Sequence, residues 1–319
     1  KVCDGNNCAS GVPGMGAVGT GESFRRNIQS LKKYKVVTRL IHDIKEPDTS
    51  AEIFGTRISL PVMAAPITGA VTNMSGAVDE LDYNIAVVRG CREAGTIAFV
   101  GDGATPEKYK IGLDAIEREN GLGIPVFKPR LDNEEIIKRI RAAEKAGALA
   151  VGMDIDAAVF KTMALRNQAV APKSVSELKE IRSATRLPFI LKGIINPRDV
   201  EMALKAGADA IIVSNHGGRV LDEMPGSMDV LGDIVKAAAG GLTIMVDGGF
   251  RDGVDILKAL ALGAQYVLIG RPVAIAAVGM GIEGTAYYMN HIKDELQKAM
   301  LLTGCGSIKD ITDDVVLAL

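Results

Sequence analysis

From about residue 60 onward, short apolar runs alternate with longer amphipathic stretches, and this alternation limits the fold more than any other feature of the sequence. Eight runs have the length and residue types of buried strands: PVMAAP, TIAFV, IPVFK, LAVGMD, PFILK, AIIVS, TIMVD and YVLIG. Most are followed by helical periodicity, as in NEEIIKRIRAAEKAG, NPRDVEMALKAG and RDGVDILKALALG. Repeated units of this kind build a parallel sheet that is covered by helices.

The alternation predicts an α/β protein with a closed (β/α)8 TIM barrel. A doubly wound open sheet is the alternative, because both folds share the same periodicity. No linker-like segment interrupts the region, so residues 60–319 are predicted to form a single barrel domain. Residues 1–59 are predicted to form an N-terminal extension that packs on the barrel. This extension is Gly-rich at first and then helical around FRRNIQSLKKY.

Charge and hydropathy exclude several kinds of partner. The net charge is -2 and charged residues make up 24% of the chain, which gives no bias toward nucleic acid. No window offers the roughly 18 uncharged apolar residues of a membrane span. The opening KVCDGNNCASG lacks the regions of a secretory signal, and the four cysteines are too scattered for a disulfide framework. A cytoplasmic location is therefore predicted.

Two motifs near the N-terminus resemble binding motifs, one for a metal or cluster and one for a dinucleotide, but neither is interpreted as a binding site. Cys3 and Cys8 are too few for a metal or cluster site, since thiolate sites usually need three or four ligands. No metal is therefore predicted. The glycines from Gly14 to Gly19 match the spacing G-x-G-x-x-G, but no predicted strand leads into them. A loop is favoured over a dinucleotide site there.

Polar residues collect at the ends of the predicted strands, where a barrel of this type builds its active site. A single charge at such a place would be interpreted as solvated. Seven strands contribute together, with Pro66, Thr68, Lys128, Arg130, Asp154, Lys192, Ser214, His216, Arg219, Asp247, Arg251, Gly270 and Arg271. The convergence predicts a site for a small anionic ligand.

The last two predicted units have the features of a phosphate cradle. VDGGFRDG and LIGRP each place glycine and an arginine, Arg251 or Arg271, directly after a buried strand. Glycine lets backbone N–H groups approach an anion, and a helix start adds partial positive charge. A phosphorylated cofactor or substrate is implied. Lys192 would then place a cation where it stabilises a reduced flavin, with a structural ion pair as the alternative.

His216 is one of only three histidines, and it lies in the stretch SNHGGR. A histidine near an arginine can act as a base on one part of an anionic substrate while the arginine holds another part. Arg219 is therefore predicted to bind a carboxylate, and Asp154 is predicted to orient the imidazole. Without its companion loops, a histidine after a strand would be interpreted as structural.

These residues resemble the FMN-dependent α-hydroxy acid oxidases and dehydrogenases. The resemblance spans nearly the whole chain and is strongest at ILKGI, IIVSNHGGRVLD, VDGGFRDGVDILKALALGAQYVLIGRP and LLTGCGSIKDI. It implies a barrel that holds FMN and oxidises a 2-hydroxy acid to a 2-oxo acid. In that reaction His216 takes the hydroxyl proton while hydride passes to flavin N5, with oxygen or another redox partner as the final acceptor. Proteins of this type often form tetramers.

The resemblance also implies the cofactor contacts. Lys192 and Ser214 would contact the flavin ring, and Asp154 would lie behind the histidine. The ribityl and phosphate contacts would come from Asp247, Gly249, Arg251, Gly270 and Arg271, and the N5 side would be lined by Ala65, Pro66, Ile67 and Thr68.

The sequence departs from the family pattern on several strands. Lys128-Pro129-Arg130 replaces Gln-x-Tyr, so Lys128 occupies a flavin-contacting position and Arg130 is predicted to face the substrate. Gly101 and Gly152 replace a serine and a threonine, and the family's loop arginines have only Lys161 and Arg166 as weak counterparts. Two alternatives stay open: an FMN barrel with other chemistry, such as a type 2 isopentenyl-diphosphate isomerase, and a flavin-binding protein without catalysis.

Overall fold

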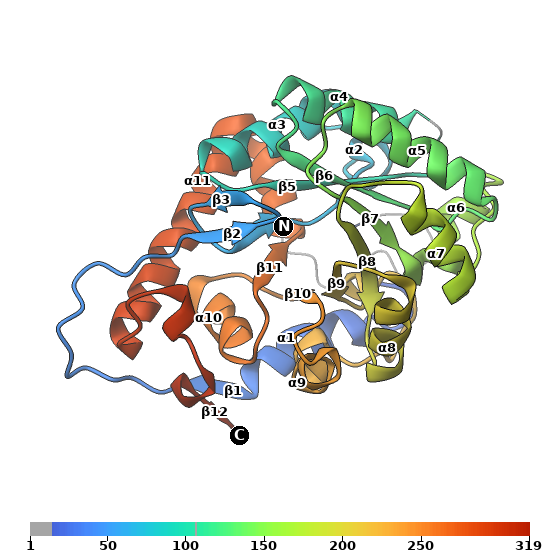
Figure 1. Ribbon diagram of the computed structural model, residues 1–319. Coiled ribbons are helices and arrows are strands. Elements are labelled where there is room, and N and C mark those ends of the chain that lie inside the picture. The colour runs from blue at the N-terminus through green and yellow to red at the C-terminus, as the bar shows by residue number, and fades with distance from the viewer. Residues whose placement is uncertain (1–14, 106) are drawn as a thin grey trace.

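The computed structural model describes residues 15–105 and 107–319. Eight parallel strands close into a barrel in the order β10-β11-β4-β5-β6-β7-β8-β9, so the closed-barrel prediction is confirmed and the open-sheet alternative is wrong (Figure 1). Each predicted strand forms in its predicted place. The strands are β4 (Val62–Ala64), β5 (Ala98–Gly101), β6 (Gly123–Phe127), β7 (Val151–Asp154), β8 (Phe189–Ile194), β9 (Ala210–Val213), β10 (Thr243–Asp247) and β11 (Tyr266–Ile269).

A helix that packs on the outside follows each barrel strand. These helices are α3 (Glu80–Glu93), α4 (Lys108–Arg118), α5 (Asn133–Lys145), α7 (Val175–Ser183), α8 (Pro197–Ala206), α9 (Ser227–Ala238), α10 (Gly253–Ala261) and α11 (Arg271–Thr303). Their ends follow local rules. For example, the Asn196 side chain accepts a bond from the backbone of Asp199, and Pro197 opens α8. Gly207 then ends the helix at φ 80°.

Four short elements shape loops after the barrel strands: α2 (Ala70–Asn73), α6 (Lys161–Ala164) and the 3-10 turns η1 (Ile155–Val159) and η2 (His216–Gly218). Two further 3-10 turns, η3 (Ile308–Asp310) and η4 (Asp313–Val315), follow α11 near the C-terminus. Two apolar layers stabilise the barrel, one inside it and one between its strands and the surrounding helices. Side chains such as Met63, Phe99 and Ile190 fill its interior, while their strand neighbours, including Val62 and Leu191, pack against the helices.

The N-terminal residues that the structure describes pack against the barrel. Helix α1 (Glu22–Lys32) lies beside α9, and Arg26 pairs with Asp229 at 2.6 Å. Strand β1 (Tyr34–Val36) pairs with the C-terminal β12 (Val316–Ala318), and a hairpin of β2 (Ala51–Ile53) and β3 (Thr56–Ile58) precedes the barrel. The domain division at residue 60 stays a prediction.

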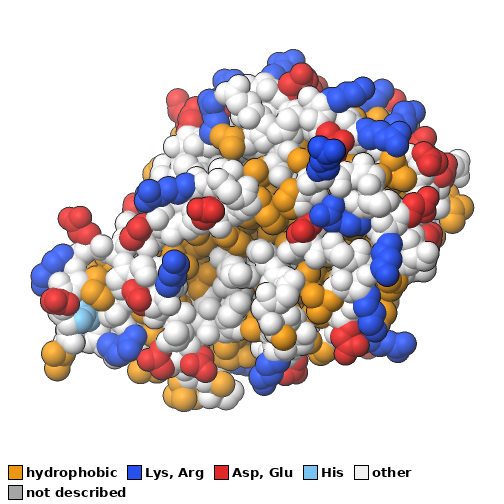
Figure 2. Space-filling model, in the orientation of Figure 1, with side chains coloured by type: hydrophobic (Ala, Val, Ile, Leu, Met, Phe, Trp, Pro, Cys, Tyr) orange, Lys and Arg blue, Asp and Glu red, His pale blue; other side chains and the backbone are white. Residues whose placement is uncertain are grey.

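Some predictions concern the first twenty residues, of which the structure describes only those from Met15 onward. Cys3, Cys8 and Gly14 lie outside the described residues, and Met15 to Thr20 form bends and turns. No helix within residues 15–105 and 107–319 is long and apolar enough to cross a membrane. Acidic and basic side chains are interspersed on the face shown in Figure 2.

Candidate active site

A partly open pocket lies at the carboxyl ends of the barrel strands. In a barrel of this type, this is the end where the active site is built. Most of the predicted site residues line it, namely Ala65, Pro66, Ile67, Lys192, His216, Arg219, Asp247, Gly249, Arg251, Gly270 and Arg271. The structure thus brings together segments that are up to about two hundred residues apart in the chain.

One end of the cavity has the donor set of a phosphate site. The loop after β10 runs through Gly248 and Gly249 at φ 109° and 90°, values that favour glycine. A Cβ at Gly249 would also lie 3.0 Å from the backbone of Asn27 in α1. Arg251 lies in the loop before α10, and Arg271 lies at the start of α11.

Two helix starts and two guanidinium groups therefore converge where the sequence predicts a phosphate. The Arg271 side chain donates from Nε to the carbonyl of Met15 at 2.6 Å and from Nη2 to the carbonyl of Gly217 at 2.8 Å. A Cβ at Gly270 would lie 3.1 Å from Ile67 Cδ1, so the glycine keeps the cavity open. These residues fit a phosphorylated cofactor that has a flat ring.

Lys192 lies in the middle of a buried charge cluster. It lies on β8, where it is paired with Asp154 of the neighbouring strand β7. Its Nζ lies 3.2 Å from Asp154 Oδ1, 3.5 Å from Asp247 Oδ2 and 3.2 Å from Ser214 Oγ. Burial acts to lower the pKa of Lys192, but the neighbouring carboxylates outweigh it and raise that pKa. Lys192 is therefore a fixed cation in the cavity wall.

Asp154 is shared between two lysines. Lys128 Nζ donates to Asp154 Oδ2 at 2.7 Å, opposite the Lys192 contact. Burial raises the pKa of Asp154, but the charges of Lys128 and Lys192 lower it further than burial raises it. Asp154 therefore stays ionised between its two lysines.

Replacing Lys192 with methionine is expected to lower the free energy of unfolding by about 3–5 kcal/mol, because it leaves buried carboxylates without their counter-charge. Lys192 is 3% exposed, and it provides the one ion pair of Asp247 within the described chain. Urea unfolding of the two proteins measures the difference. The matched control is Lys236→Met, which removes a surface pair of 3.8 Å and should change little. Equal midpoints for Lys192→Met and the wild type would contradict this account of the cluster.

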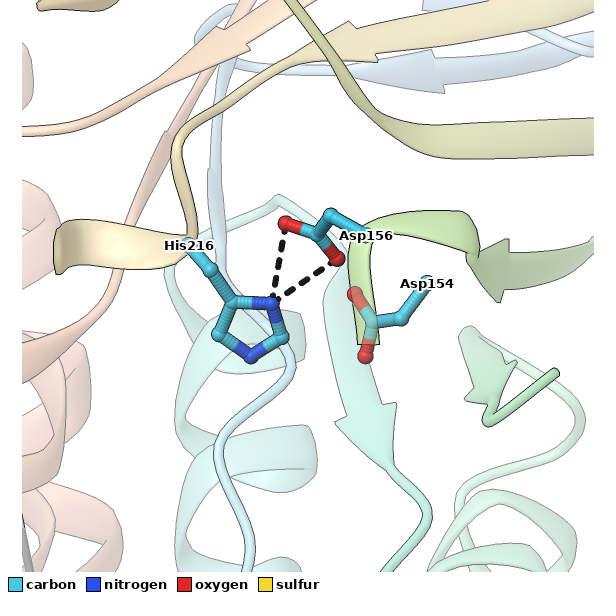
Figure 3. A group of neighbouring side chains, drawn as sticks. All are labelled: Asp154, Asp156 and His216. Atoms are coloured by element: carbon cyan, nitrogen blue, oxygen red, sulfur yellow. Dashed lines mark hydrogen bonds and ion pairs between the residues drawn. The ribbon is translucent and has the colours of Figure 1, made fainter. Parts of the chain in front are cut away.

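His216 pairs with Asp156, so the prediction that Asp154 orients the imidazole is wrong. His216 Nδ1 lies 3.0 Å and 3.1 Å from the two carboxylate oxygens of Asp156 (Figure 3). Asp154 lies beside them in the same view, where the two lysines hold it. Since a carboxylate accepts, Nδ1 carries the proton and Nε2 keeps its lone pair.

The environment of His216 keeps the imidazole neutral. Burial is the largest influence and lowers the pKa of His216, and the nearby Lys192 acts in the same direction. Asp156 opposes this shift without cancelling it. The residue has a left-handed backbone at φ 55°, which Ser214 supports by accepting a bond from the His216 amide at 3.0 Å. The His216 imidazole is thus held neutral in a fixed position.

A second cavity of about 460 Å³ adjoins the first and shares four residues with it: Pro66, Ile67, His216 and Arg219. Thr68 and Lys128, both predicted to contact the cofactor, line this second cavity. The Thr68 hydroxyl donates to Glu80 Oε1 at 2.6 Å, and this bond fixes the loop after β4. Phe160 lines this second cavity together with Lys128.

Arg130 does not line either cavity, so the prediction that it faces the substrate is wrong. Its Nη2 donates to Asp102 Oδ2 at 2.9 Å and to the Gly103 carbonyl at 2.9 Å, and its Nη1 donates to Gln168 at 2.7 Å. The side chain is 4% exposed. Arg130 therefore ties two loops together in a buried ion pair.

Asp156 and Phe160 were not predicted from the sequence. The structure shows why Asp156 can approach β8: Gly193 in ILKGI has φ 103°, and a Cβ there would lie 2.5 Å from Asp156 Cβ. Gly101 has a similar role, since a Cβ there would lie 3.2 Å from Thr68 Cγ2. Of the weak loop candidates, Arg166 is exposed and lines neither cavity, and the side chain of Lys161 lies outside the described part.

Comparisons with known proteins agree with this geometry. A family model described as "FMN-dependent dehydrogenase" matches residues 15–176 and 167–318. The chain is 33% identical to a 2-hydroxyacid oxidase of Dictyostelium discoideum, covering 92% of this chain and 82% of that protein. It is 34% identical to a 4-hydroxymandelate oxidase of Amycolatopsis orientalis, covering 92% and 89%.

Solved structures show the same likeness. Mandelate oxidase with (S)-2-phenylpropionate is 32% identical, covers 92% of this chain and 89% of that chain, and superimposes with a TM-score of 0.76. A mandelate oxidase variant that carries an FMN adduct has the same identity and TM-score, over 93% and 91% of the two chains. The chain therefore belongs to the FMN-dependent dehydrogenase family, and FMN is its cofactor.

Proposed function

We propose that this protein oxidises a 2-hydroxy acid to the corresponding 2-oxo acid. The observation that carries the proposal is the bond from His216 Nδ1 to Asp156, because it leaves Nε2 to accept a proton where the two cavities meet. Arg219 lines the same two cavities and provides a guanidinium for a carboxylate. A base and a carboxylate-binding group side by side suit a 2-hydroxy acid, which carries a hydroxyl next to a carboxylate.

The residues divide the reaction between them. Arg219 binds the carboxylate and orients the hydroxyl toward His216 Nε2, which takes the hydroxyl proton as the C2–H bond breaks. Bound FMN would supply the hydride acceptor for the C2 hydrogen. Asp156 stabilises the imidazolium that forms, and Lys192 supplies positive charge to the cavity wall. The substrate loses one hydride, which carries both electrons, and one proton, which His216 accepts, and this balances the conversion to a 2-oxo acid.

The pH dependence follows from the environment of His216. The base works only when it is neutral, and burial holds its pKa below the ordinary value of 6.5. The acid limb of kcat/KM is therefore expected to have its midpoint at a pH below 6.5. Stopped-flow reduction measured above and below this pH tests the expectation. A limb centred at or above pH 6.5 would contradict it.

Product analysis tests the proposed reaction. The FMN-loaded protein is incubated with a panel of 2-hydroxy acids, and 2-oxo acid is quantified together with oxygen uptake and the reduction of an artificial acceptor. One 2-oxo acid formed for each oxygen consumed would identify an oxidase, and reduction of the artificial acceptor alone would identify a dehydrogenase. Absence of 2-oxo acid under both conditions would overturn the proposal.

The alternatives receive less support. Lys128 and Arg130 suggested a substrate with a second anionic group, as in an isopentenyl-diphosphate isomerase. In the structure, however, they pair with Asp154 and Asp102. A non-catalytic flavin-binding protein would leave the base and the guanidinium at this cavity without a use. The cytoplasmic location and the tetramer stay predictions from composition and from the family resemblance.

A further inference from the structure

Phe160 lies among the charged groups of the site, although no step of the proposed reaction uses it. It follows η1 in the loop after β7 and is 8% exposed. Its ring centre lies 5.1 Å from that of His216, with the two planes tilted by 34°. Lys128 Nζ lies 4.9 Å from the same ring centre, and Arg219 Cζ lies 5.2 Å from it. One aromatic ring therefore contacts the base, the guanidinium and a buried lysine.

The ring contacts two cations of the site. Lys128 also pairs with the Asp154 carboxylate at 2.7 Å. For Arg219, the face of Phe160 is a rigid surface that attracts a cation without occupying its N–H donors. The N–H donors lie at the edge of the planar guanidinium, and two of them can bind the two oxygens of one carboxylate.

We propose that Phe160 is a positioning residue whose ring holds the Arg219 guanidinium in place for the substrate carboxylate and covers one side of the His216 imidazole. The inference rests on the proposed function, because it assigns Arg219 and His216 the same roles. It adds a residue from the loop after β7, where the family resemblance offered only weak arginine counterparts.

The position of Phe160 between two hollows supports the covering role. It lines the inner cavity of about 460 Å³ and also an outer groove formed by the loop, with Ala158, Val159 and Val170. Met163 and Ala157 pack against the ring and keep it between the two spaces. The ring therefore lies between the outer groove and the cavity that His216 lines.

The charged groups around His216 define what removal of the ring would do. They are Asp154 at the end of β7, Asp156 in η1, Lys192 on β8, Lys128 directly after β6 and, in the loop of His216 itself, Arg219. Since burial is the largest influence that lowers the pKa of His216, access of water from the outer groove would raise that pKa toward 6.5.

The first test separates the aromatic ring from its bulk. In Phe160→Leu, the apolar cover remains but the ring face is lost. In Phe160→Tyr, the ring face is retained. Binding of the 2-oxo acids pyruvate and phenylglyoxylate is followed by the change in the FMN absorption band. We expect about tenfold weaker binding for Phe160→Leu, a matching rise in KM with kcat within about twofold, and near wild-type values for Phe160→Tyr. Equal binding by Phe160→Leu and the wild type would overturn the role assigned to the ring.

The second test needs no substrate. The chain has only three histidines, so the imidazole titrations are followed by NMR, and the resonance of His216 is the one missing in His216→Asn. We expect the pKa of His216 to rise in Phe160→Ala and to stay low in Phe160→Leu. The control Leu165→Ala changes an exposed side chain of the same loop and should leave the titration and the binding unchanged. An unchanged His216 titration in Phe160→Ala would overturn the covering role.

The two tests also distinguish failure of the proposed function from failure of this inference. If the wild type binds and forms no 2-oxo acid, the proposed function fails, while the histidine titration still decides whether Phe160 covers His216.

Discussion

Replacing His216 with asparagine is expected to slow reduction of the bound FMN by a 2-hydroxy acid by about 10²- to 10⁴-fold, the range that general-base catalysis contributes. Asparagine is chosen because residue 216 has φ 55°, a conformation that asparagine adopts more readily than most residues. The loop should therefore keep its shape while the base is lost. Anaerobic stopped-flow absorbance measures the rate.

The matched control is His291→Asn. His291 is an exposed residue of α11, and its Nε2 lies 3.5 Å from Glu295 Oε1. This variant should reduce at the wild-type rate. The FMN content of both variants is measured first, so that a lost cofactor is not mistaken for lost catalysis. Reduction of His216→Asn within tenfold of the wild-type rate would show that His216 is not the base.

Replacing Asp156 with asparagine is expected to lower the rate of FMN reduction by up to about 10⁴-fold, because the change favours the wrong tautomer of His216. The Asp156 carboxylate holds the proton on Nδ1 at 3.0 Å. An amide can instead donate to Nδ1, which moves the proton to Nε2 and leaves no lone pair there for the substrate. The same change removes the charge that stabilises the imidazolium.

A parallel Asp154→Asn variant separates the two carboxylates. Asp154 is paired with Lys128 and Lys192, so this change should mainly lower the free energy of unfolding and reduce the rate less than Asp156→Asn does. Stopped-flow rates and urea midpoints are compared for the two variants. A larger rate loss in Asp154→Asn would restore the original assignment of the orienting carboxylate.

The series of strand and helix units and the position of the site were predictable because both depend on local patterns. Apolar runs such as PFILK and YVLIG alternate with helical stretches, a pattern that closed barrels and open parallel sheets share, and in both folds the site lies after the strands. The phosphate end was visible as well, since glycines and arginines after the last two strands have one common physical use. These features require no knowledge of which side chains meet across the barrel.

The side-chain pairings were not predictable in the same way. Asp154 and Asp156 are two positions apart, and the choice between them depends on where β7 ends and the turn η1 begins. The register places Asp154 against Lys192, and the turn then brings Asp156 to His216. Arg130 was misassigned for a related reason, because its partner Asp102 lies in the preceding strand's loop.

The most direct test of the whole account is an anaerobic titration of the FMN-loaded protein with a panel of 2-hydroxy acids, followed by the visible absorbance of the flavin. The account predicts that at least one acid bleaches the flavin band, that the wild type and His291→Asn respond alike, and that His216→Asn responds far more slowly. A protein that binds FMN but whose flavin no 2-hydroxy acid reduces would contradict the proposed reaction.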